Sequence, residues 1–465
     1  MTTETATTGI LTDRIFTPGL AQVAYLIADT EAGEAAIIDP RRDVDAYVAW
    51  AEERGLRFVT ILETHVHADF VSGGKELARV TGAPIYAPRL GQVEYEHTPV
   101  DDGDVIHVGR ARLKAVWTPG HTPEHIAFLL LPDPESEEPV ALYSGDVLFV
   151  GDVGRPDLLG DEATERLSNQ LYETVTERLK TLPDDVIVYP GHTAGSSCGK
   201  KIGDAPSTTI GAEKIGNYAF RHDSREPFVA DVMEGMPKPP AYYPQLKKVN
   251  KAGATYLADL PAPRPLSPED VRTAMANGSM VIDVRDFASF GQKHIPGAIF
   301  AGFGPNFHTW MGWLAPYDRD LVIVGGEDAP IDEIVTALHQ IGIDRVTGYL
   351  DGGIDAWDGE VATLPQLDVR SLHASRGDYH VLDVRNPDEW AQGHIEGAMH
   401  HPATEIATGN LPANLPDDKP LAVICGTGYR SSVTASILQG SGVDNLVNVA
   451  GGMTAWNEAG QPVVK

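Results

Sequence analysis

Three polar side chains in residues 65–70 are spaced to hold a metal ion. His65, His67 and Asp69 alternate with apolar residues, and imidazole together with carboxylate suits zinc or iron(II). The apolar run at residues 58–62 has strand composition and would deliver the histidines at the carboxyl end of a strand. Further potential ligands follow three other short apolar runs: His121, Asp146 and His192. These residues predict a metal centre built from loops at strand ends.

The order of these ligands resembles the metallo-β-lactamase superfamily, whose usual pattern is H-x-H-x-D-H followed by a distant His, an Asp and a last His. The resemblance covers about the first half of the chain. At the sixth position stands Phe70, whose ring has no lone pair to offer, so we expect one metal rather than two. By resemblance, the one-metal branch is the persulfide dioxygenases, which implies one Fe(II) per chain held by His65, His121 and Asp146.

Three other polar residues of the motif have a supporting role in this interpretation. His67, Asp69 and His192 would hydrogen-bond the metal ligands and fix their tautomers. Direct ligation by His67 stays open, because sequence does not exclude it. A single histidine is more often a satisfied loop or core residue. Four loop-end motifs in the family's order favour a site instead.

A loop rich in glycine and charge follows Asp146, and the resemblance implies that it lies beside the substrate entrance. Its Arg155 could bind an anionic group of the substrate, because a guanidinium binds carboxylates through two hydrogen bonds. Pairing with Asp152 or Asp157, which would brace the loop, is an equally good interpretation. The sequence is consistent with either role of Arg155.

Ala194 and Cys198, which both follow His192, bear on the choice of substrate. Ala194 stands where the glutathione-using relatives have Tyr, so the resemblance leaves the thiol carrier open among glutathione, coenzyme A and other cellular thiols. Cys198 follows six residues after His192. It is either an inert loop thiol or a thiol that lines the metal pocket and relays sulfur.

The second half of the chain contains a duplication. The segment around Asp283 and Arg285 recurs around Asp383 and Arg385, offset by 100 residues. A period of that length indicates duplicated domains and not a solenoid. Both copies resemble rhodanese domains, whose D-V-R, G-H-I-x-G-A and G-G-x-x-A-W segments occur here in order.

Only the second copy has a thiol where a rhodanese needs one. Cys425 follows an apolar run at residues 421–424 and begins a glycine-containing loop before a predicted helix, an arrangement that aims backbone N–H groups at sulfur. Arg430 would bind a sulfite or thiosulfate anion. The loop residues between them are predicted to contact substrate: Gly426, Thr427, Gly428 and Tyr429. The first copy has Gly325 at the aligned position, so we expect it to be a catalytically silent spacer or docking surface.

Length and composition agree with a multidomain enzyme. The 465 residues suggest about three domains, and two cysteines argue against a disulfide framework. The formal net charge of −30 disfavours binding to nucleic acid or anionic membranes, which need basic patches. The N-terminal residues 1–8 lack the basic and apolar regions of a secretory signal. We therefore expect a cytoplasmic enzyme, as a dimer or tetramer in keeping with its size.

The chain is predicted to divide into four segments. Residues 1–245 should form a four-layer αββα sandwich with the metal at one edge of its two sheets, and residues 246–264 a stiff proline-rich linker. Residues 265–361 and 362–465 should form two parallel α/β domains, the second with its thiol beyond the carboxyl ends of the strands. The fold class is therefore α/β throughout.

The predicted function joins the two chemistries. The metal domain would oxidise a low-molecular-weight persulfide with O2 to sulfite and thiol, and Cys425 would pass a sulfane sulfur to that sulfite to give thiosulfate. Two alternatives remain. A glyoxalase-II-like thioesterase shares the fold and most ligands, although it normally keeps His at the position of Phe70. A sensing protein with a vestigial metal domain is disfavoured by the intact motifs.

Overall fold

The computed structural model describes residues 5–7 and 9–465 and divides into two compact units. Unit 1 comprises the chain up to Asp259 together with residues 339–342, and unit 2 comprises the rest. Residues 1–4 and 8, which belong to the segment considered above for a secretory signal, lie outside the described residues. Among the described residues, no helix combines the length and apolar character that a membrane span requires.

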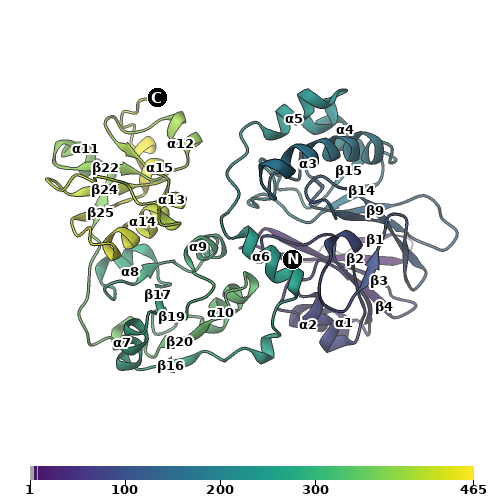
Figure 1. The fold of residues 1–465 in the computed structure, drawn as a ribbon, viewed down its shortest axis with the longest axis horizontal. Helices are drawn as coiled ribbons and strands as arrows, with labels where there is room; N and C mark the ends of the chain where they lie inside the picture. The colour runs from purple at the N-terminus through teal and green to yellow at the C-terminus, as the bar shows by residue number, and fades with distance from the viewer. Residues whose placement is uncertain (1–4, 8) are drawn as a thin grey trace. The chain divides into compact units, whose positions relative to one another are not determined.

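Unit 1 contains two sheets of different topology (Figure 1). The first has its seven strands in chain order: β1 (Thr5–Thr7), β2 (Ile10–Thr17), β3 (Gln22–Asp29), β4 (Glu34–Ile38), β5 (Arg57–Leu62), β6 (Ile85–Pro88) and β7 (Thr98–Val100). The second is ordered β15 (Thr208–Thr209), β14 (Ile187–Pro190), β11 (Ala141–Gly145), β10 (Ile126–Leu131), β9 (Ala111–Trp117) and β8 (Val105–Val108). A separate hairpin joins β12 (Leu148–Phe149) to β13 (Asp152–Val153).

Helices cover the outer face of each sheet. The first sheet carries α1 (Asp45–Glu53) and α2 (Gly74–Thr81), and the second carries α3 (Asp161–Glu173), α4 (Ile210–Gly216) and α5 (Arg225–Met233). Short helical turns complete the unit: η1 (Arg89–Gly91), η2 (Thr174–Leu179), η3 (Tyr218–Arg221) and η4 (Leu257–Asp259). Strand side chains alternate between faces, so each sheet contributes to a shared inner core and to an outer core under its helices. The predicted four-layer αββα sandwich is confirmed.

The helix α6 (Tyr243–Ala252) occupies the start of the predicted linker. Its Asn250 donates from Nδ2 to the carbonyl oxygens of His67 (2.9 Å) and Phe70 (2.7 Å) and accepts from the backbone N–H of Ser72 at 2.9 Å. Residues 246–252 are therefore part of unit 1 and hold the loop that carries the histidines. The prolines had placed the end of the first domain at residue 245. Two of them, at positions 240 and 244, instead flank the beginning of this helix.

Unit 2 contains two parallel sheets of the same topology. The first copy is built from β16 (Arg264–Leu266), α7 (Pro268–Ala276), β17 (Met280–Asp283), α8 (Phe287–Gln292), β18 (Ile299–Phe300), α9 (Phe307–Leu314), β19 (Leu321–Val324), α10 (Ile331–Gln340), β20 (Val346–Leu350) and η5 (Gly353–Ala356). Its strand order is β16-β20-β19-β17-β18. All of its strand pairs are parallel, as predicted.

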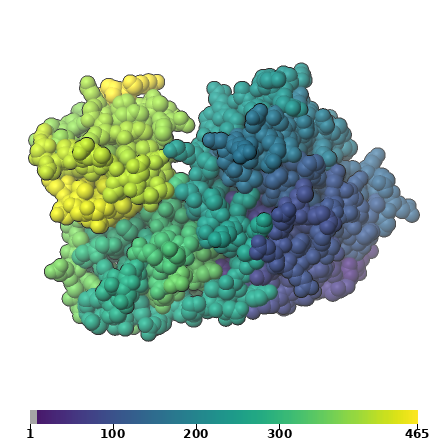
Figure 2. Space-filling view, in the orientation of Figure 1, coloured from purple at the N-terminus to yellow at the C-terminus, as the bar shows by residue number. Residues whose placement is uncertain are grey.

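The second copy repeats this plan with strand order β21-β25-β24-β22-β23. Its elements are β21 (Gln366–Asp368), α11 (Val369–Ala374), η6 (Arg376–Asp378), β22 (His380–Asp383), α12 (Pro387–Gln392), β23 (Met399–His400), α13 (Ala403–Ala407), β24 (Leu421–Ile424), α14 (Tyr429–Gly440), β25 (Leu446–Ala450) and α15 (Gly452–Glu458). The two copies share a core: Phe300 and Trp310 of the first pack in one cluster with Val433 and Leu438 of the second. The space-filling view shows the copies abutting (Figure 2).

Candidate metal centre and thiol site

The potential metal ligands stand on loops at one edge of the two sheets of unit 1. His65 follows β5, His121 follows β9, Asp146 follows β11 and His192 follows β14. The loop that follows each strand presents its polar groups at this edge, where they are buried. The loop-end arrangement expected from the sequence is therefore present in the structure.

His65, His121 and Asp146 form a group whose potential ligand atoms lie within 4.8 Å of one another. Oδ2 of Asp146 is 3.9 Å from Nε2 of His65 and 3.6 Å from Nε2 of His121. All three side chains are buried, and this Oδ2 has no hydrogen-bond partner among the described residues. A buried carboxylate oxygen without a donor is costly unless a cation binds it, so the donor set fits a metal ion.

The other ring nitrogen of each histidine is already occupied. Nδ1 of His65 lies 2.8 Å from the hydroxyl of Thr64, and Nδ1 of His121 lies 3.0 Å from the carbonyl oxygen of Arg155, to which it donates. Burial, followed by the neighbouring histidines, lowers the pKa of His65 well below its ordinary value, and burial also lowers the pKa of His121. Both rings are therefore neutral and direct the Nε2 lone pair toward Asp146, as metal ligands must.

His125 supports Asp146 and was not singled out from the sequence. Its Nε2 accepts the backbone N–H of Asp146 at 3.0 Å, while its Nδ1 lies 2.8 Å from the hydroxyl of Thr118. Burial and the nearby His121 lower its pKa to about 3, which keeps the ring neutral and able to accept. The available signal was its position four residues after His121. Gly145 has φ +50°, and a Cβ there would lie 2.6 Å from Nε2 of His125, so only glycine fits.

His192 joins two carboxylates behind the centre. Its Nδ1 is 2.7 Å from Oδ1 of Asp146, and its Nε2 is 2.7 Å from Oδ2 of Asp69. Burial by itself lowers the pKa of His192, but the two carboxylates outweigh burial and raise it to about 10. A protonated ring has no lone pair to offer a metal, so in this arrangement His192 links the carboxylates of Asp146 and Asp69. Cys198 belongs to the same group, and burial and these carboxylates raise the pKa of its thiol.

His67 points to a separate pair of carboxylates. Its Nε2 lies 3.1 Å from Oδ1 of Asp39 and 3.5 Å from Oε2 of Glu63, and its ring centroid is 4.4 Å from that of Phe70. Although burial lowers its pKa, Asp39 and then Glu63 raise it well above the ordinary value. Phe70 is completely buried and adds no ligand. Asp39 and Glu63 were missed because one lies far away in sequence and the other is hidden at the end of an apolar run.

Arg155 is fully buried and its donors are largely used inside the loop. Nε and Nη2 bind the two oxygens of Asp157 at 2.6 and 2.8 Å, and Nη1 donates to the carbonyl oxygen of Ser197 at 3.1 Å. Nη2 also donates to the carbonyl oxygen of Pro237. This geometry favours the bracing interpretation over substrate binding, because a buried guanidinium that is already paired has little left to offer an anion.

The thiol site lies at the end of β24 in unit 2. Sγ of Cys425 accepts the backbone N–H of Gly428 at 3.1 Å and the hydroxyl of Ser431 at 3.4 Å. Gly428 has φ +108°, a conformation that lets the loop curl around the sulfur before α14 begins. Arg430 is paired with Glu389, a residue that was not singled out from the sequence. The hydroxyl of Tyr429 donates to the carbonyl oxygen of Gly302 in the first copy and so points away from the thiol.

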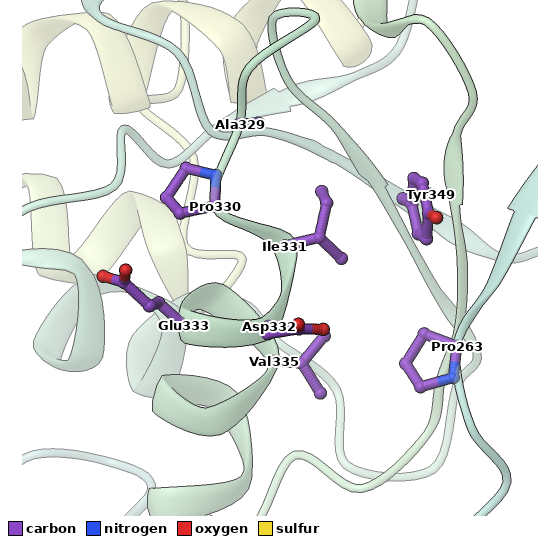
Figure 3. A pocket seen from close by; sticks show the side chains of 8 residues that line it. All are labelled: Pro263, Ala329, Pro330, Ile331, Asp332, Glu333, Val335 and Tyr349. Carbon is purple, nitrogen blue, oxygen red and sulfur yellow. The ribbon is translucent and has the colours of Figure 1, made fainter.

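The first copy shares one backbone contact at Gly325 but none of this chemistry. Its carbonyl oxygen accepts from Ile354, just as that of Cys425 accepts from Met453. A pocket of about 470 Å³ opens beside the start of α10 (Figure 3). Its lining has carboxylates but no thiol, imidazole or cation: Pro263, Ala329, Pro330, Ile331, Asp332, Glu333, Val335 and Tyr349.

Comparison with known proteins assigns both halves. The metallo-beta-lactamase superfamily matches residues 17–192, and the rhodanese-like domain matches residues 267–360 and 368–459. A crystal structure of a metallo-beta-lactamase from Staphylococcus aureus aligns with a TM-score of 0.67 and 33% identity, over 74% of this chain and 99% of that one. Fold and site thus define a metallo-β-lactamase domain joined to two rhodanese-like domains.

Two curated relatives resemble the first half. Hydroxyacylglutathione hydrolase of Polaromonas is 40% identical over 171 residues, which cover 36% of this chain and 60% of that protein. Human mitochondrial persulfide dioxygenase ETHE1 is 33% identical over 187 residues, which cover 39% of this chain and 68% of that protein. The chain belongs to the persulfide dioxygenase family of the metallo-beta-lactamase superfamily.

Proposed function

We propose that the first domain uses one iron(II) ion, held by His65, His121 and Asp146, to oxidise a low-molecular-weight persulfide. The substrate R–S–SH, O2 and water would give R–SH, sulfite and two protons, which balances atoms and electrons. The observation that carries the proposal is the single carboxylate oxygen of Asp146 that faces Nε2 of both histidines. Iron bound by two histidines and one carboxylate would supply open positions for O2 and the persulfide sulfur.

The surrounding residues have defined tasks in this proposal. His192 holds Asp146 from behind, and His125 fixes the backbone of the same residue. Phe70 fills the position of a further ligand with an apolar ring, which supports a single metal. Phe70 and His67 also pack against each other, with ring centroids 4.4 Å apart.

The second rhodanese-like domain is proposed to transfer sulfur. A persulfide on Cys425 would give its outer sulfur to sulfite, forming thiosulfate and regenerating the thiolate. The N–H of Gly428 and the hydroxyl of Ser431 would stabilise the sulfur anion. Gly325 leaves the first copy without a nucleophile at the equivalent position.

Metal analysis of anaerobically purified protein, combined with O2 uptake, tests the proposal. We expect about one iron per chain and O2 uptake that depends on an added persulfide, with glutathione persulfide and coenzyme A persulfide as the two first substrates. The uptake should be lost in D146A, and the wild type should convert part of the sulfite to thiosulfate, because the added persulfide also loads Cys425. Iron-loaded protein that consumes no O2 with either persulfide would contradict the proposal.

A thioester hydrolase is the second candidate, and the 40% identity to hydroxyacylglutathione hydrolase favours it. That reaction needs a metal-bound water and a thioester, and no O2. The two candidates are separated by incubating the same protein with a glutathione thioester and following thiol release under anaerobic conditions. Release with two metals per chain would assign the hydrolase.

A further inference from the structure

Arg430, beside the thiol, is neutralised by a carboxylate of the same domain. Its Nη1 lies 2.6 Å from Oε2 of Glu389 and its Nη2 lies 2.7 Å from Oε1, so the planar guanidinium meets the carboxylate through two parallel hydrogen bonds. The side chains are 23% and 35% exposed, so water only partly screens the pair. Such fork-to-fork pairs are the strongest that arginine makes with a carboxylate.

Arg430 and Glu389 lie against the loop that begins with Cys425. A Cβ added to Gly426 would lie 3.1 Å from Nη2 of Arg430 and 3.9 Å from Oε1 of Glu389. The same loop turns back at Gly428, whose N–H reaches the sulfur. A small anion that approached the sulfur by way of Arg430 would therefore meet the carboxylate of Glu389 as well.

The duplication separates features of the fold from features of the thiol site. The pair of Asp383 with Arg385 is repeated by Asp283 with Arg285, at 2.6 Å in both copies. The stacking of Trp390 on His394 is likewise repeated by the stacking of Phe290 on His294. These features persist in a copy without a thiol, so they belong to the fold.

The three residues of the thiol site are absent together from the first copy. At the offset of 100 residues, Gly325 replaces Cys425, Pro330 replaces Arg430 and Ser289 replaces Glu389. The offset holds on both sides of the loop, because β19 and β20 each begin 100 residues before β24 and β25. Within the first copy, the pairing of β19 with β20 has a register shift after Leu321, which lies beyond this loop. The equivalent helix α8 is capped instead by Asp286, to which Ser289 donates.

We infer that Glu389 determines which sulfur compounds the thiol site accepts, by competing for Arg430 with small dianions such as thiosulfate and sulfite. A dianion must either displace the carboxylate or share the guanidinium with it against like-charge repulsion. A persulfide carried on a larger thiol does not need Arg430 to hold its sulfur. Under the proposed function, on which this inference rests, the site would load from persulfides and release thiosulfate readily.

The step concerned is a balanced exchange at sulfur. The thiolate of Cys425 attacks the outer sulfur of thiosulfate, the S–S bond of thiosulfate breaks, and sulfite leaves with the bonding pair. The new S–S bond makes Cys425 a persulfide, and the reverse step makes thiosulfate from sulfite. Cyanide removes the outer sulfur as thiocyanate and returns the thiolate, which gives a steady-state assay.

The test is the Glu389→Gln variant of the full chain, assayed with thiosulfate as donor and cyanide as acceptor. Glutamine removes the charge but retains an oxygen that can accept the N–H of Asn386, so the cap of α12 is kept. We expect the KM for thiosulfate to fall at least about fivefold, with kcat within about twofold. Glu389→Asp, which restores the charge, should return the KM toward the wild-type value.

Asp388→Asn is the matched control, because it removes an exposed charge from the neighbouring position of the same helix. Its KM for thiosulfate should stay near the wild-type value. An unchanged or higher KM in Glu389→Gln, or an equal fall in Asp388→Asn, would overturn the inference. Thiocyanate formation that survives in Cys425→Ser would instead contradict the proposed sulfur transfer itself, so the two failures are distinguishable.

Discussion

His192 hydrogen-bonds one oxygen of the Asp146 carboxylate and thereby orients the other oxygen toward His65 and His121. Oδ1 is held by Nδ1 of His192 at 2.7 Å, and Oδ2 is left facing the two neutral histidines. A carboxylate that is free to rotate would offer either oxygen, so this hydrogen bond fixes which lone pair is presented to a metal. Four loops that are far apart in the sequence meet in this relationship.

Replacing His121 should empty the metal centre. His121→Ala removes one of three proposed ligands, so we expect the iron content to fall from about one per chain to a small fraction, with persulfide-dependent O2 uptake lost. Iron is measured by elemental analysis after anaerobic purification. His107→Ala, at an exposed histidine on β8, should retain iron. Retained iron in His121→Ala would remove this residue from the ligand set.

Restoring the family's sixth residue should add a second metal. In Phe70→His the new imidazole would lie on the loop beside Asp69, which already groups with His192 and Cys198. We expect the metal content to rise toward two ions per chain when the protein is expressed in zinc-supplemented medium. Phe70→Leu serves as the control for lost packing and should still bind one. A single metal in Phe70→His would mean that the ring is not what limits the metal count.

Removing the rhodanese thiol should change the product and leave the oxidation intact. Cys425→Ser should consume O2 with persulfide at the wild-type rate, because Cys425 belongs to a different unit from the metal ligands. Sulfite should accumulate in place of thiosulfate, as measured by chromatography of the derivatised anions. A thiosulfate-to-sulfite ratio equal to that of the wild type would disprove the relay.

Cys198 should resist alkylation in the folded protein. Burial and then the charges of Asp69 and Asp146 raise the pKa of its thiol well above the ordinary value, so almost no thiolate is present at neutral pH. We expect peptide mass spectrometry to find Cys198 unmodified after iodoacetamide treatment at pH 7.5 and modified after unfolding in urea. Rapid native labelling would show that the loop at residues 195–200 opens.

The pair of Glu389 with Arg430 should stabilise the second rhodanese-like domain in a pH-dependent way. Burial raises the pKa of Glu389, but the hydrogen bonds and charge of Arg430 lower it below the ordinary 4.5. A lowered folded pKa contributes stability above pH 4.5 that is lost as pH falls through the folded value. Glu389→Gln should therefore melt about 2 °C lower at pH 7, with the difference shrinking as the pH falls below 4.5, as followed by calorimetry. A difference independent of pH would point to packing alone.

The sequence alone determined the fold and the order of the candidate ligands along the chain. Apolar runs that end in His or Asp predicted strands with ligands at their carboxyl ends, and the offset of 100 residues predicted two copies of one α/β domain. Both predictions rest on local order along the chain, which periodicity and motif spacing record directly.

Only the tertiary structure decided how the polar groups share their hydrogen bonds. It paired Arg155 with Asp157, turned His67 toward Asp39 and Glu63, and placed Glu389 against Arg430. It also made α6 part of the first unit through Asn250, where the prolines had predicted a linker. Burial forces each polar side chain to find a partner, and partners brought together by folding are distant in the sequence. Spacing can therefore name the residues of a site, but only the packed chain assigns their partners.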